Sequence, residues 1–284
     1  MSDRRAFFRD LAAAARDAAA GGAPRPETAS TAAAAPPGLS EAELERYSRQ
    51  LVLPEWSESA QLALRGASAL VVGAGALGSP VAAYLAGAGV GRLGIVDADV
   101  VEVSNLNRQH LHFTPDAGVP KAHSAAAKLS FLNPEVVVEP YQVRLEEGNA
   151  AGLIEGNDLV VDCSDSFATR YVVNAACCES GTLLVEGGVL GTSGLVMAIR
   201  PGETACYRCA FPQAPPSAPS CAEAGVLGPA AGVVGSLQAL EALKLLSGVG
   251  EALTNAFLQV DLGALSFLRV AVSRRPDCAD CVAA

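Results

Sequence analysis

The chain has 284 residues, of which 50% are hydrophobic and 18% charged, so it can bury a substantial core and is not disordered as a whole. Its 20 basic and 30 acidic residues give a formal net charge of −10, which leaves no basic stripe to bind nucleic acid or anionic membranes. Aromatic residues make up 5%, whereas glycine occurs 28 times. This composition favours tight turns over aromatic surfaces on which nucleic-acid bases stack. Neither nucleic acid nor a membrane is therefore an expected partner.

Residues 1–38 are rich in alanine, glycine and proline and hold few large apolar side chains, which predicts a flexible tail followed by one domain over residues 39–284. The pair Arg4-Arg5 is similar to a twin-arginine export signal, but Arg16 and Asp17 interrupt the apolar segment that such a signal needs. Four of the eight cysteines form two C-x-x-C pairs, a pattern that favours metal ligands over disulfides. We therefore expect a cytoplasmic protein.

The ordered part is expected to begin with a helix. Ser40 and Glu43 have the spacing of a capping box. The helix that follows should carry Leu44, Tyr47 and Leu51 on one face.

A strand, a glycine turn and a helix are predicted next. Residues 69–72 are apolar, Gly73, Gly75 and Gly78 follow, and an apolar helical pattern then extends to Gly89. Pro80 falls in the first turn of this helix, where a missing N–H does no harm. A second strand over residues 93–96 ends at Asp97.

Three further short apolar segments, residues 136–138, 159–161 and 183–185, alternate with helical patterns. This order predicts a mostly parallel sheet with right-handed crossovers, a doubly wound, Rossmann-like α/β fold. Residues 211–219 are rich in proline, serine and alanine and are expected to form an exposed, mobile loop. The apolar helix expected over residues 232–246 suits either core packing or a dimer face.

The glycine turn predicts binding of an adenine nucleotide. Gly73 and Gly75 permit the tight turn and close approach of a phosphate, and Gly78 permits close packing of helix and strand. Asp97 is placed to bind a ribose hydroxyl. These residues alone do not decide between NAD and ATP.

Charged residues further along favour transfer of a phosphoryl or nucleotidyl group. They occur in Ser104-Asn105-Leu106-Asn107-Arg108-Gln109, at Lys121 and in Asp162-Cys163-Ser164-Asp165. Such chemistry needs cations for the leaving pyrophosphate and oxygen ligands for Mg²⁺. Taken singly, Arg108 and Lys121 also suit solvated surface charges, and Asp165 also suits a helix cap.

The chain resembles the HesA/MoeB/ThiF family, bacterial relatives of the ubiquitin-activating enzymes, over roughly residues 40–284, and is most similar to its MoeB-type members. The matching motifs include the glycine turn and the charged segments above. The others are Arg46-Tyr47-Ser48-Arg49-Gln50, Cys206-Tyr207-Arg208-Cys209, Cys221-Ala222-Glu223-Ala224-Gly225-Val226 and Cys278-Ala279-Asp280-Cys281. The resemblance implies an adenylyltransferase that activates the C-terminal Gly-Gly carboxylate of a ubiquitin-like sulfur carrier, consuming ATP and releasing pyrophosphate.

The resemblance also implies roles for individual residues. Asp97 would hold the ribose, Asp165 the Mg²⁺, and Arg49 the phosphates of the neighbouring subunit in a homodimer; the triphosphate would be held by Asn105, Arg108 and Lys121. The expected nucleotide site also contains Gly73, Gly75, Ala76, Gly78, Asp99, Ser104, Gln109 and Ser166. Ala76 and Ser166 depart from the family, where glycine and asparagine are common, but neither departure removes a charge.

The cysteines are expected to have three different roles. Cys206, Cys209, Cys278 and Cys281 have the spacing of a closed tetrahedral zinc site, which is structural. The resemblance places Cys221 where some members form a covalent thioester or persulfide intermediate, although an exposed loop cysteine without a role fits equally. Cys163, Cys177 and Cys178 lie in apolar segments and are expected in the core.

His110, His112 and His123 have no spacing that suggests a metal site, and no role is assigned to them. Because three residues follow Cys281, sulfur is expected to come from a separate donor. A non-catalytic subunit that only docks the carrier remains an alternative, and so does an NAD-dependent oxidoreductase, which would rest on the glycine turn alone. The carrier and its pathway, for molybdopterin, thiamine, cysteine or thiolated tRNA, stay open.

Overall fold

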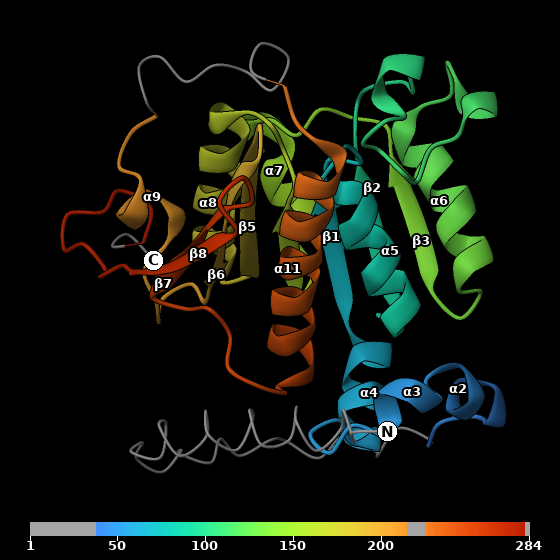
Figure 1. Ribbon diagram of the computed structural model, residues 1–284. Helices are drawn as coiled ribbons and strands as arrows, with labels where there is room; N and C mark the ends of the chain where they lie inside the picture. Colours follow the sequence, from blue (N-terminus) through green and yellow to red (C-terminus); the bar gives the residue numbers. More distant parts are fainter. Residues whose placement is uncertain (1–37, 215–224, 282–284) are drawn as a thin grey trace. The chain divides into compact units, whose positions relative to one another are not determined.

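The computed structural model describes residues 38–214 and 225–281 (Figure 1). These residues belong to one compact unit, Gly38–Ala284. The tail expected over residues 1–38 lies outside the described residues except for Gly38, as does most of the loop expected over residues 211–219.

One eight-stranded sheet forms the centre of the unit, in the order β3-β2-β1-β4-β5-β6-β7-β8. Its first five strands pair in parallel. They are β1 (Ser68–Val72), β2 (Arg92–Val96), β3 (Val137–Tyr141), β4 (Leu159–Asp162) and β5 (Leu183–Leu190). Each of the five strands predicted from the apolar segments is therefore present, and the doubly wound fold is confirmed.

Three antiparallel strands extend the sheet beyond β5, and the sequence patterns did not predict them. They are β6 (Ser193–Ile199), β7 (Ala256–Asp261) and β8 (Ser266–Ala271). In β8 five of the six residues are exposed, so an apolar run or a clean alternation does not mark it.

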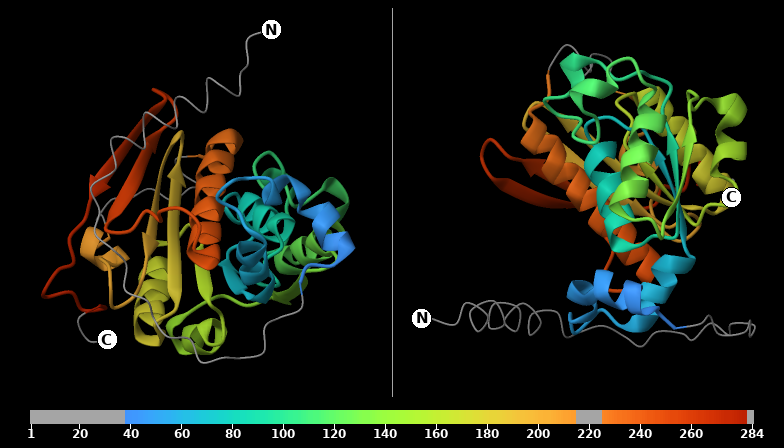
Figure 2. Two further views of the ribbon diagram at one scale, coloured as in Figure 1. Left: turned by 90° about the horizontal axis from the view of Figure 1, so that it is seen from below. Right: turned by 90° about the vertical axis from the view of Figure 1, so that its right-hand side faces the viewer.

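Helices cover both faces of the sheet (Figure 2). One face carries α5 (Gly78–Ala88) and α11 (Gly228–Ser247), which contact each other, together with α4 (Glu58–Gly66) and α6 (Lys121–Leu132). The other face carries α7 (Glu147–Ile154) and α8 (Phe167–Ser180), with the short α9 (Tyr207–Ala210) beside α8. No helix in the described ranges is long and apolar enough to cross a membrane.

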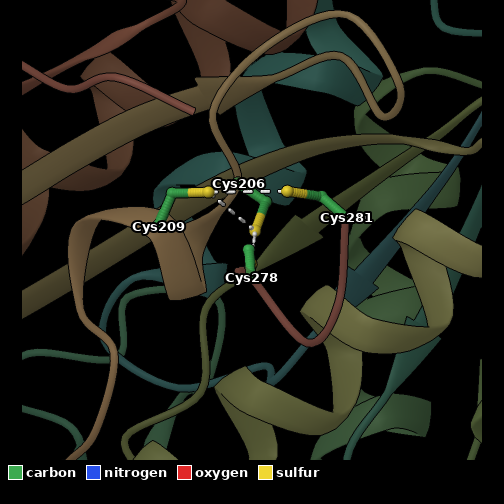
Figure 3. Close-up of side chains that lie close together, drawn as sticks. All are labelled: Cys206, Cys209, Cys278 and Cys281. Carbon is green, nitrogen blue, oxygen red and sulfur yellow. Dashed lines mark hydrogen bonds between the residues drawn. The ribbon is translucent and has the colours of Figure 1, made fainter. Parts of the chain in front are cut away.

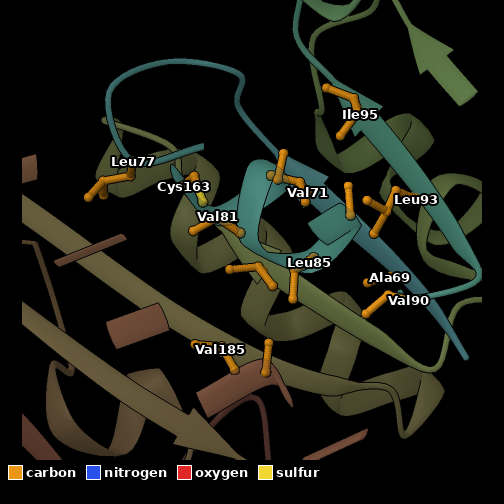
Figure 4. Close-up of a cluster of buried hydrophobic side chains, with 14 of the residues drawn as sticks. Ala69, Val71, Leu77, Val81, Leu85, Val90, Leu93, Ile95, Cys163 and Val185 are labelled. Atoms are coloured by element: carbon orange, nitrogen blue, oxygen red, sulfur yellow. The ribbon is translucent and has the colours of Figure 1, made fainter. Parts of the chain in front are cut away.

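The two helical layers give two hydrophobic cores, and β1 contributes to both. Ala69 and Val71 pack with α5 on one face (Figure 4), whereas Leu70 and Val72 pack with the α7 and α8 layer. Successive side chains of a strand point to opposite faces. A strand covered on both faces therefore reads as a continuous apolar run, which is why this segment was recognisable.

Glycines fix both ends of α5. A Cβ on Gly78 would lie 1.8 Å from the carbonyl oxygen of Gly73, so only glycine lets the helix start this close to the turn. At the other end Gly89 caps the helix with φ 88°, a left-handed conformation that disfavours other residues. Pro80 lies in the first turn, as predicted.

The first predicted helix is only partly correct. The capping box is confirmed, since Ser40 Oγ accepts a hydrogen bond from the Glu43 N–H and Glu43 Oε2 accepts one from the Ser40 N–H. The helix α2 (Glu41–Arg46) ends before Tyr47, however, and α3 (Ser48–Leu51) follows as a separate turn. Tyr47 leaves the helical path because its buried ring lies against Gly89. Leu44 consequently remains exposed.

Candidate nucleotide and metal sites

A pocket lies at the carboxyl ends of β1, β2 and β4, where the chain reverses direction across the sheet. In doubly wound folds ligands bind at this switch point. Most residues predicted to bind the nucleotide line it, namely Gly73, Gly75, Ala76, Asp97, Asp99, Arg108, Gln109, Lys121, Asp165 and Ser166. Residues far apart in the sequence thus come together in one cavity.

The glycine turn lines this pocket and packs closely against the neighbouring strand ends. Gly73 has φ 97°, and a Cβ there would lie 3.0 Å from the carbonyl oxygen of Cys163. The backbone N–H of Gly73 donates to Val96 O at 2.7 Å. The turn therefore needs glycine for its conformation and is joined to the end of β2.

Asp97 directly follows β2 and joins it to the turn. Its Oδ2 accepts a hydrogen bond from the Ala74 N–H and its Oδ1 accepts one from the Asp99 N–H, both at 2.8 Å. Each carboxylate oxygen has a further lone pair. The fixed carboxylate can therefore also accept hydrogen bonds from a ligand in the pocket.

Two predicted cations reach the pocket from different segments. Lys121 begins α6, is buried, and has its Nζ 3.0 Å from Asp99 Oδ2. Arg108 donates to Ser104 O at 3.0 Å and to Asn107 Oδ1 at 3.1 Å. Positive charge therefore gathers beside the glycine turn, where an anion would lie.

Arg144 also lines the pocket, and the sequence did not single it out. Its Nη2 lies 3.9 Å from Asp99 Oδ1. The residue follows β3, the strand next to β2. Its position after a predicted strand is the one sequence feature that pointed to the pocket. Assigning Arg144 to the site from that position also required the order of the strands in the sheet.

Three predicted nucleotide residues are near the pocket without lining it. Gly78 begins α5 behind the turn. Ser104 and Asn105 belong to the 3₁₀ turn η1 (Val103–Asn105), where Asn105 Oδ1 accepts the Glu102 N–H at 3.3 Å. Their side chains stabilise the segment that carries Arg108, and direct contact of either with a nucleotide stays a prediction.

Arg49 lies far from the pocket of its own chain. It is exposed on α3, which precedes α4 and the amino end of β1, whereas the pocket is at the carboxyl end (Figure 1). Within the described part of the chain, Arg49 makes no ion pair. A single chain therefore does not bring it to the nucleotide.

The predicted metal cysteines converge (Figure 3). Cys206 is the N-cap of α9 and Cys209 lies within that helix, whereas Cys278 and Cys281 lie near the end of the chain. The Sγ–Sγ distances are 3.5 Å for Cys206 and Cys278, 3.5 Å for Cys209 and Cys281, and 3.8 Å for Cys206 and Cys209. All four sulfurs lie within 4.8 Å of one another, so the cluster can hold a metal ion.

Neighbouring polar groups hold the second cysteine pair in place. Asp280 accepts hydrogen bonds from Asn174 Nδ2 at 2.6 Å, and it pairs with Arg208 Nε at 2.7 Å. Burial raises the pKa of the Cys281 thiol to about 12 and raises that of Cys209. Without a metal these thiols are therefore protonated at neutral pH.

The remaining cysteines and histidines are mostly as expected. Cys163, Cys177 and Cys178 are buried in the core. Burial raises the pKa of Cys163 well above its ordinary value, which makes it unreactive. Cys221 lies outside the described residues.

His112, to which no role was assigned, supports the glycine turn. It is buried, its Nε2 is 2.9 Å from Ala74 O, and its Nδ1 is 2.9 Å from Ser124 Oγ. An Nε2–H that donates to the carbonyl leaves Nδ1 to accept the serine hydroxyl. No spacing in the sequence signals this contact, because it joins segments 38 residues apart.

The fold and the pocket define a nucleotide-binding α/β protein of the Rossmann-like class that carries a four-cysteine cluster. Residues 47–280 match the model of the ThiF family. The chain belongs to this family.

Curated relatives are about half identical to the chain. The adenylyltransferase and sulfurtransferase MOCS3 of Sus scrofa is 50% identical over 246 residues, which are 86% of this chain and 54% of that protein. The sulfur carrier protein adenylyltransferase of Thermus thermophilus is also 50% identical over 246 residues, 84% of this chain and 91% of that protein. The SAMP-activating enzyme E1 of Haloferax volcanii is 45% identical over 245 residues, 86% of this chain and 90% of that protein. The chain thus spans about half of the MOCS3 protein and most of the other two.

Solved structures support the fold. Crystal structures of E. coli MccB include one with a TM-score of 0.77 at 22% identity, which covers 84% of this chain and 74% of that one. The crystal structure of PaaA has a TM-score of 0.71 at 18% identity, covering 96% of this chain and 84% of that one.

Proposed function

We propose that this protein adenylylates the C-terminal Gly-Gly carboxylate of a ubiquitin-like sulfur carrier. The observation that carries the proposal is the gathering of Arg108, Lys121 and Asp165 in one pocket beside the glycine turn. Hydride transfer needs no such set of charges, whereas departure of pyrophosphate does. Two relatives support the same activity, one named an adenylyltransferase and sulfurtransferase and the other a sulfur carrier protein adenylyltransferase.

In the proposed reaction a carboxylate oxygen of the carrier attacks the α-phosphorus of ATP. The bond to the oxygen that bridges the α- and β-phosphates breaks, and pyrophosphate leaves with the electron pair. The attacking group is already an anion and needs no general base, so positioning and charge neutralisation supply the catalysis. Arg108 and Lys121 would bind the phosphates, and Asp97 would orient the ribose.

Asp165 suits the role of Mg²⁺ ligand, because its exposed carboxylate lines the pocket and hard cations take oxygen ligands. Bound Mg²⁺ would neutralise charge on the phosphates. Asp165 would orient the ion from the loop after β4. Ser166 holds this loop at the start of α8, where its Oγ accepts the Thr169 N–H at 3.4 Å.

The four cysteines fit structural Zn²⁺. Zn–S bonds of about 2.3 Å in a tetrahedron place the sulfurs about 3.8 Å apart, close to the 3.5–3.8 Å seen here. Four thiolates leave no position for water, so the ion would join the C-terminal segment to α9 without taking part in catalysis.

A homodimer would bring Arg49 of one subunit to the phosphates of the other. Beside Arg49, Gln50 lines an apolar groove between α5 and α11 that also includes Tyr84 and Leu240. Both of these large side chains are more than half exposed. A second copy that covers this groove would bury them, in keeping with the dimer proposed for the family.

A separate protein would deliver the sulfur, and a cytoplasmic location would supply ATP and keep the thiols reduced. Cys221 stays a candidate for a covalent step with the carrier. Replacement by Ser tests this role, since loss of a reducible adduct with the carrier, but not of adenylylation, is the expected result. Equal sulfur delivery by the two proteins would exclude the covalent step.

Carrier-dependent exchange of pyrophosphate into ATP tests the whole proposal. Arg108→Ala should lower the exchange rate by about 10³-fold. Arg269→Ala, which removes an exposed arginine on β8, is the matched control and should leave the rate unchanged. A folded wild type that binds the carrier without ATP-dependent exchange would point instead to a docking subunit, and a response to NAD alone would point to an oxidoreductase.

A further inference from the structure

Three charged side chains are buried together beneath the loop that carries Asp165. Asp162 on β4 and Glu186 on β5 are register partners in adjacent parallel strands, and both are 0% exposed. Arg170 of α8 is also buried, and its Nη1 lies 3.2 Å from Glu186 Oε1. Two carboxyl groups therefore face one guanidinium where water does not reach.

These charges do not balance if both acids are ionised. A buried net negative charge is costly, and the usual response is uptake of a proton. In the described part of the chain, Arg170 is the one cation that acts on either carboxyl group. The other titratable groups around the cluster are the thiols of Cys163 and Cys177 and the phenol of Tyr207, and their pKa values are raised by burial. These groups are neutral, so they do not compensate the negative charge of the two carboxylates.

The hydrogen bonding is incomplete in the same place. Asp162 Oδ2 and both carboxyl oxygens of Glu186 are buried and accept no well-aligned hydrogen bond from the described residues, although Glu186 Oε1 is in an ion pair with Arg170. All are acceptors if the two acids are ionised, so they cannot bond to each other. One proton between the two groups converts an acceptor into a donor and joins them. Burial raises the pKa of both acids, consistent with this arrangement.

The cluster holds the residue that precedes Asp165. Asp162 Oδ1 accepts the backbone N–H of Ser164 at 2.8 Å, and Arg170 Nη2 donates to the carbonyl of Ser164 at 2.9 Å. The backbone N–H and C=O of Ser164, which belong to the two peptide units on either side of its Cα, are thus both fixed by the cluster. Asp165, which lines the pocket, follows directly, so the cluster holds the backbone next to it.

We propose that Asp162 and Glu186 share one proton, and that Glu186, as a neutral acid, is a positioning residue for Asp165. Its hydroxyl donates to Asp162 Oδ2 and its carbonyl oxygen accepts from Arg170. Asp162 then stays anionic and holds Ser164. The part of this inference that concerns catalysis rests on the proposed function, whereas the shared proton does not.

Glu186→Gln and Glu186→Leu separate a neutral acid from an ionised one. A glutamine amide can donate to Asp162 and accept from Arg170 just as the neutral acid does. The Tm of Glu186→Gln should therefore stay within about 3 °C of the wild-type value. Leucine leaves Asp162 and Arg170 without this hydrogen-bond partner, so the Tm of Glu186→Leu should fall by about 5 °C or more. Glu135→Gln, which changes an exposed acid, is the control. A glutamine variant that is as unstable as the leucine variant would overturn the shared proton.

Two further measurements need no activity. The infrared spectrum of the folded wild type at pH 8 should contain the carbonyl stretch of a neutral carboxylic acid, which Glu186→Gln loses and Glu135→Gln retains. Hydrogen exchange of the Ser164 amide should be slow in the wild type and Glu186→Gln, and faster in Glu186→Leu. Absence of the infrared band, or equal exchange in all variants, would overturn the inference.

Pyrophosphate exchange then tests positioning. Glu186→Gln should retain the wild-type rate and Mg²⁺ dependence. Glu186→Leu should lose about 10²-fold in kcat, the size of effect expected from a small misplacement, and need more Mg²⁺. If the infrared and exchange results are as expected but the wild type has no ATP-dependent activity, the proposed function fails and the shared proton stands.

Discussion

The carboxylate of Asp97 accepts a hydrogen bond from the backbone N–H of Ala74 at 2.8 Å. The acid that follows β2 therefore holds the glycine turn that follows β1. If the same acid also binds a ribose, Asp97→Ala should weaken ATP binding by about 10–100-fold, the loss expected for a hydrogen bond to a charged group. Calorimetry on this variant and on Glu135→Gln, which should bind normally, checks the expectation.

Lys121 is in an ion pair, its Nζ lying 3.0 Å from Asp99 Oδ2. Lys121→Met keeps the length of the side chain and removes the charge that would stabilise the phosphates. The rate of pyrophosphate exchange should fall by about 10³-fold, with the Tm changed by less than about 4 °C. An unchanged rate would remove Lys121 from the catalytic site.

Gly78 and Gly152 offer a matched pair of substitutions. Alanine at Gly78 would press its Cβ against the carbonyl oxygen of Gly73, at 1.8 Å, whereas at Gly152 in α7 a Cβ meets nothing within 4 Å. Gly78→Ala should destabilise the fold by about 1–3 kcal/mol or more. Gly152→Ala should stabilise it by about 0.5–1 kcal/mol. Urea denaturation measures both, and equal effects would contradict the packing described for the turn.

His112 should make stability depend on pH. Burial lowers its pKa in the folded protein, so below the unfolded value of about 6.5 the unfolded chain binds a proton that the folded chain does not. The resulting stability is complete above that pH and is lost as the pH falls toward the folded pKa. His112→Gln should flatten the decline of the unfolding free energy between about pH 7 and pH 5, which urea titrations at several pH values can measure.

Metal removal should loosen the C-terminal segment. Because burial raises the pKa values of the Cys209 and Cys281 thiols, binding releases protons, and affinity should fall as the pH is lowered. Chelation and Cys278→Ser should lower the Tm and speed hydrogen exchange in α9, while exchange in β1 stays slow. Metal analysis of the purified protein gives the stoichiometry, and one zinc per chain is expected.

The sequence was sufficient for the parts of the fold that are buried on both faces. Residues 69–72 formed an apolar run because helices cover both sides of β1. In β8 Phe267 and Leu268 are adjacent and both are exposed. Neither a buried apolar run nor an alternation of apolar and polar residues therefore marks this strand. Tyr47 is a third case, because its contact with Gly89, distant in the sequence, ended a helix whose local pattern continued.

The site also combines residues that the local sequence identified with residues that only the folded topology brings in. Motif spacing led to Arg108, Lys121 and Asp165, and the structure brings them into one pocket. Arg144 follows a predicted strand and Glu186 lies in β5, but neither position could be assigned to the site from the local sequence. Their positions have meaning only once β3 lies beside β2 and β5 beside β4. Pairing across strands is set by the whole topology, which a single sequence does not display.

The cysteine cluster also closes a long loop of chain. Cys206 and Cys278 are 72 residues apart, and α11, β7 and β8 lie between them. An ion that joined these ends would restrict the unfolded chain much as a crosslink does, an entropic effect of about 4 kcal/mol for a loop of this length. The helix α11, in which Gln238 Nε2 donates a hydrogen bond to the carbonyl of Asp162, lies inside that loop. Retention of the ion would thus make α11 and the end of the sheet unfold as one cooperative unit.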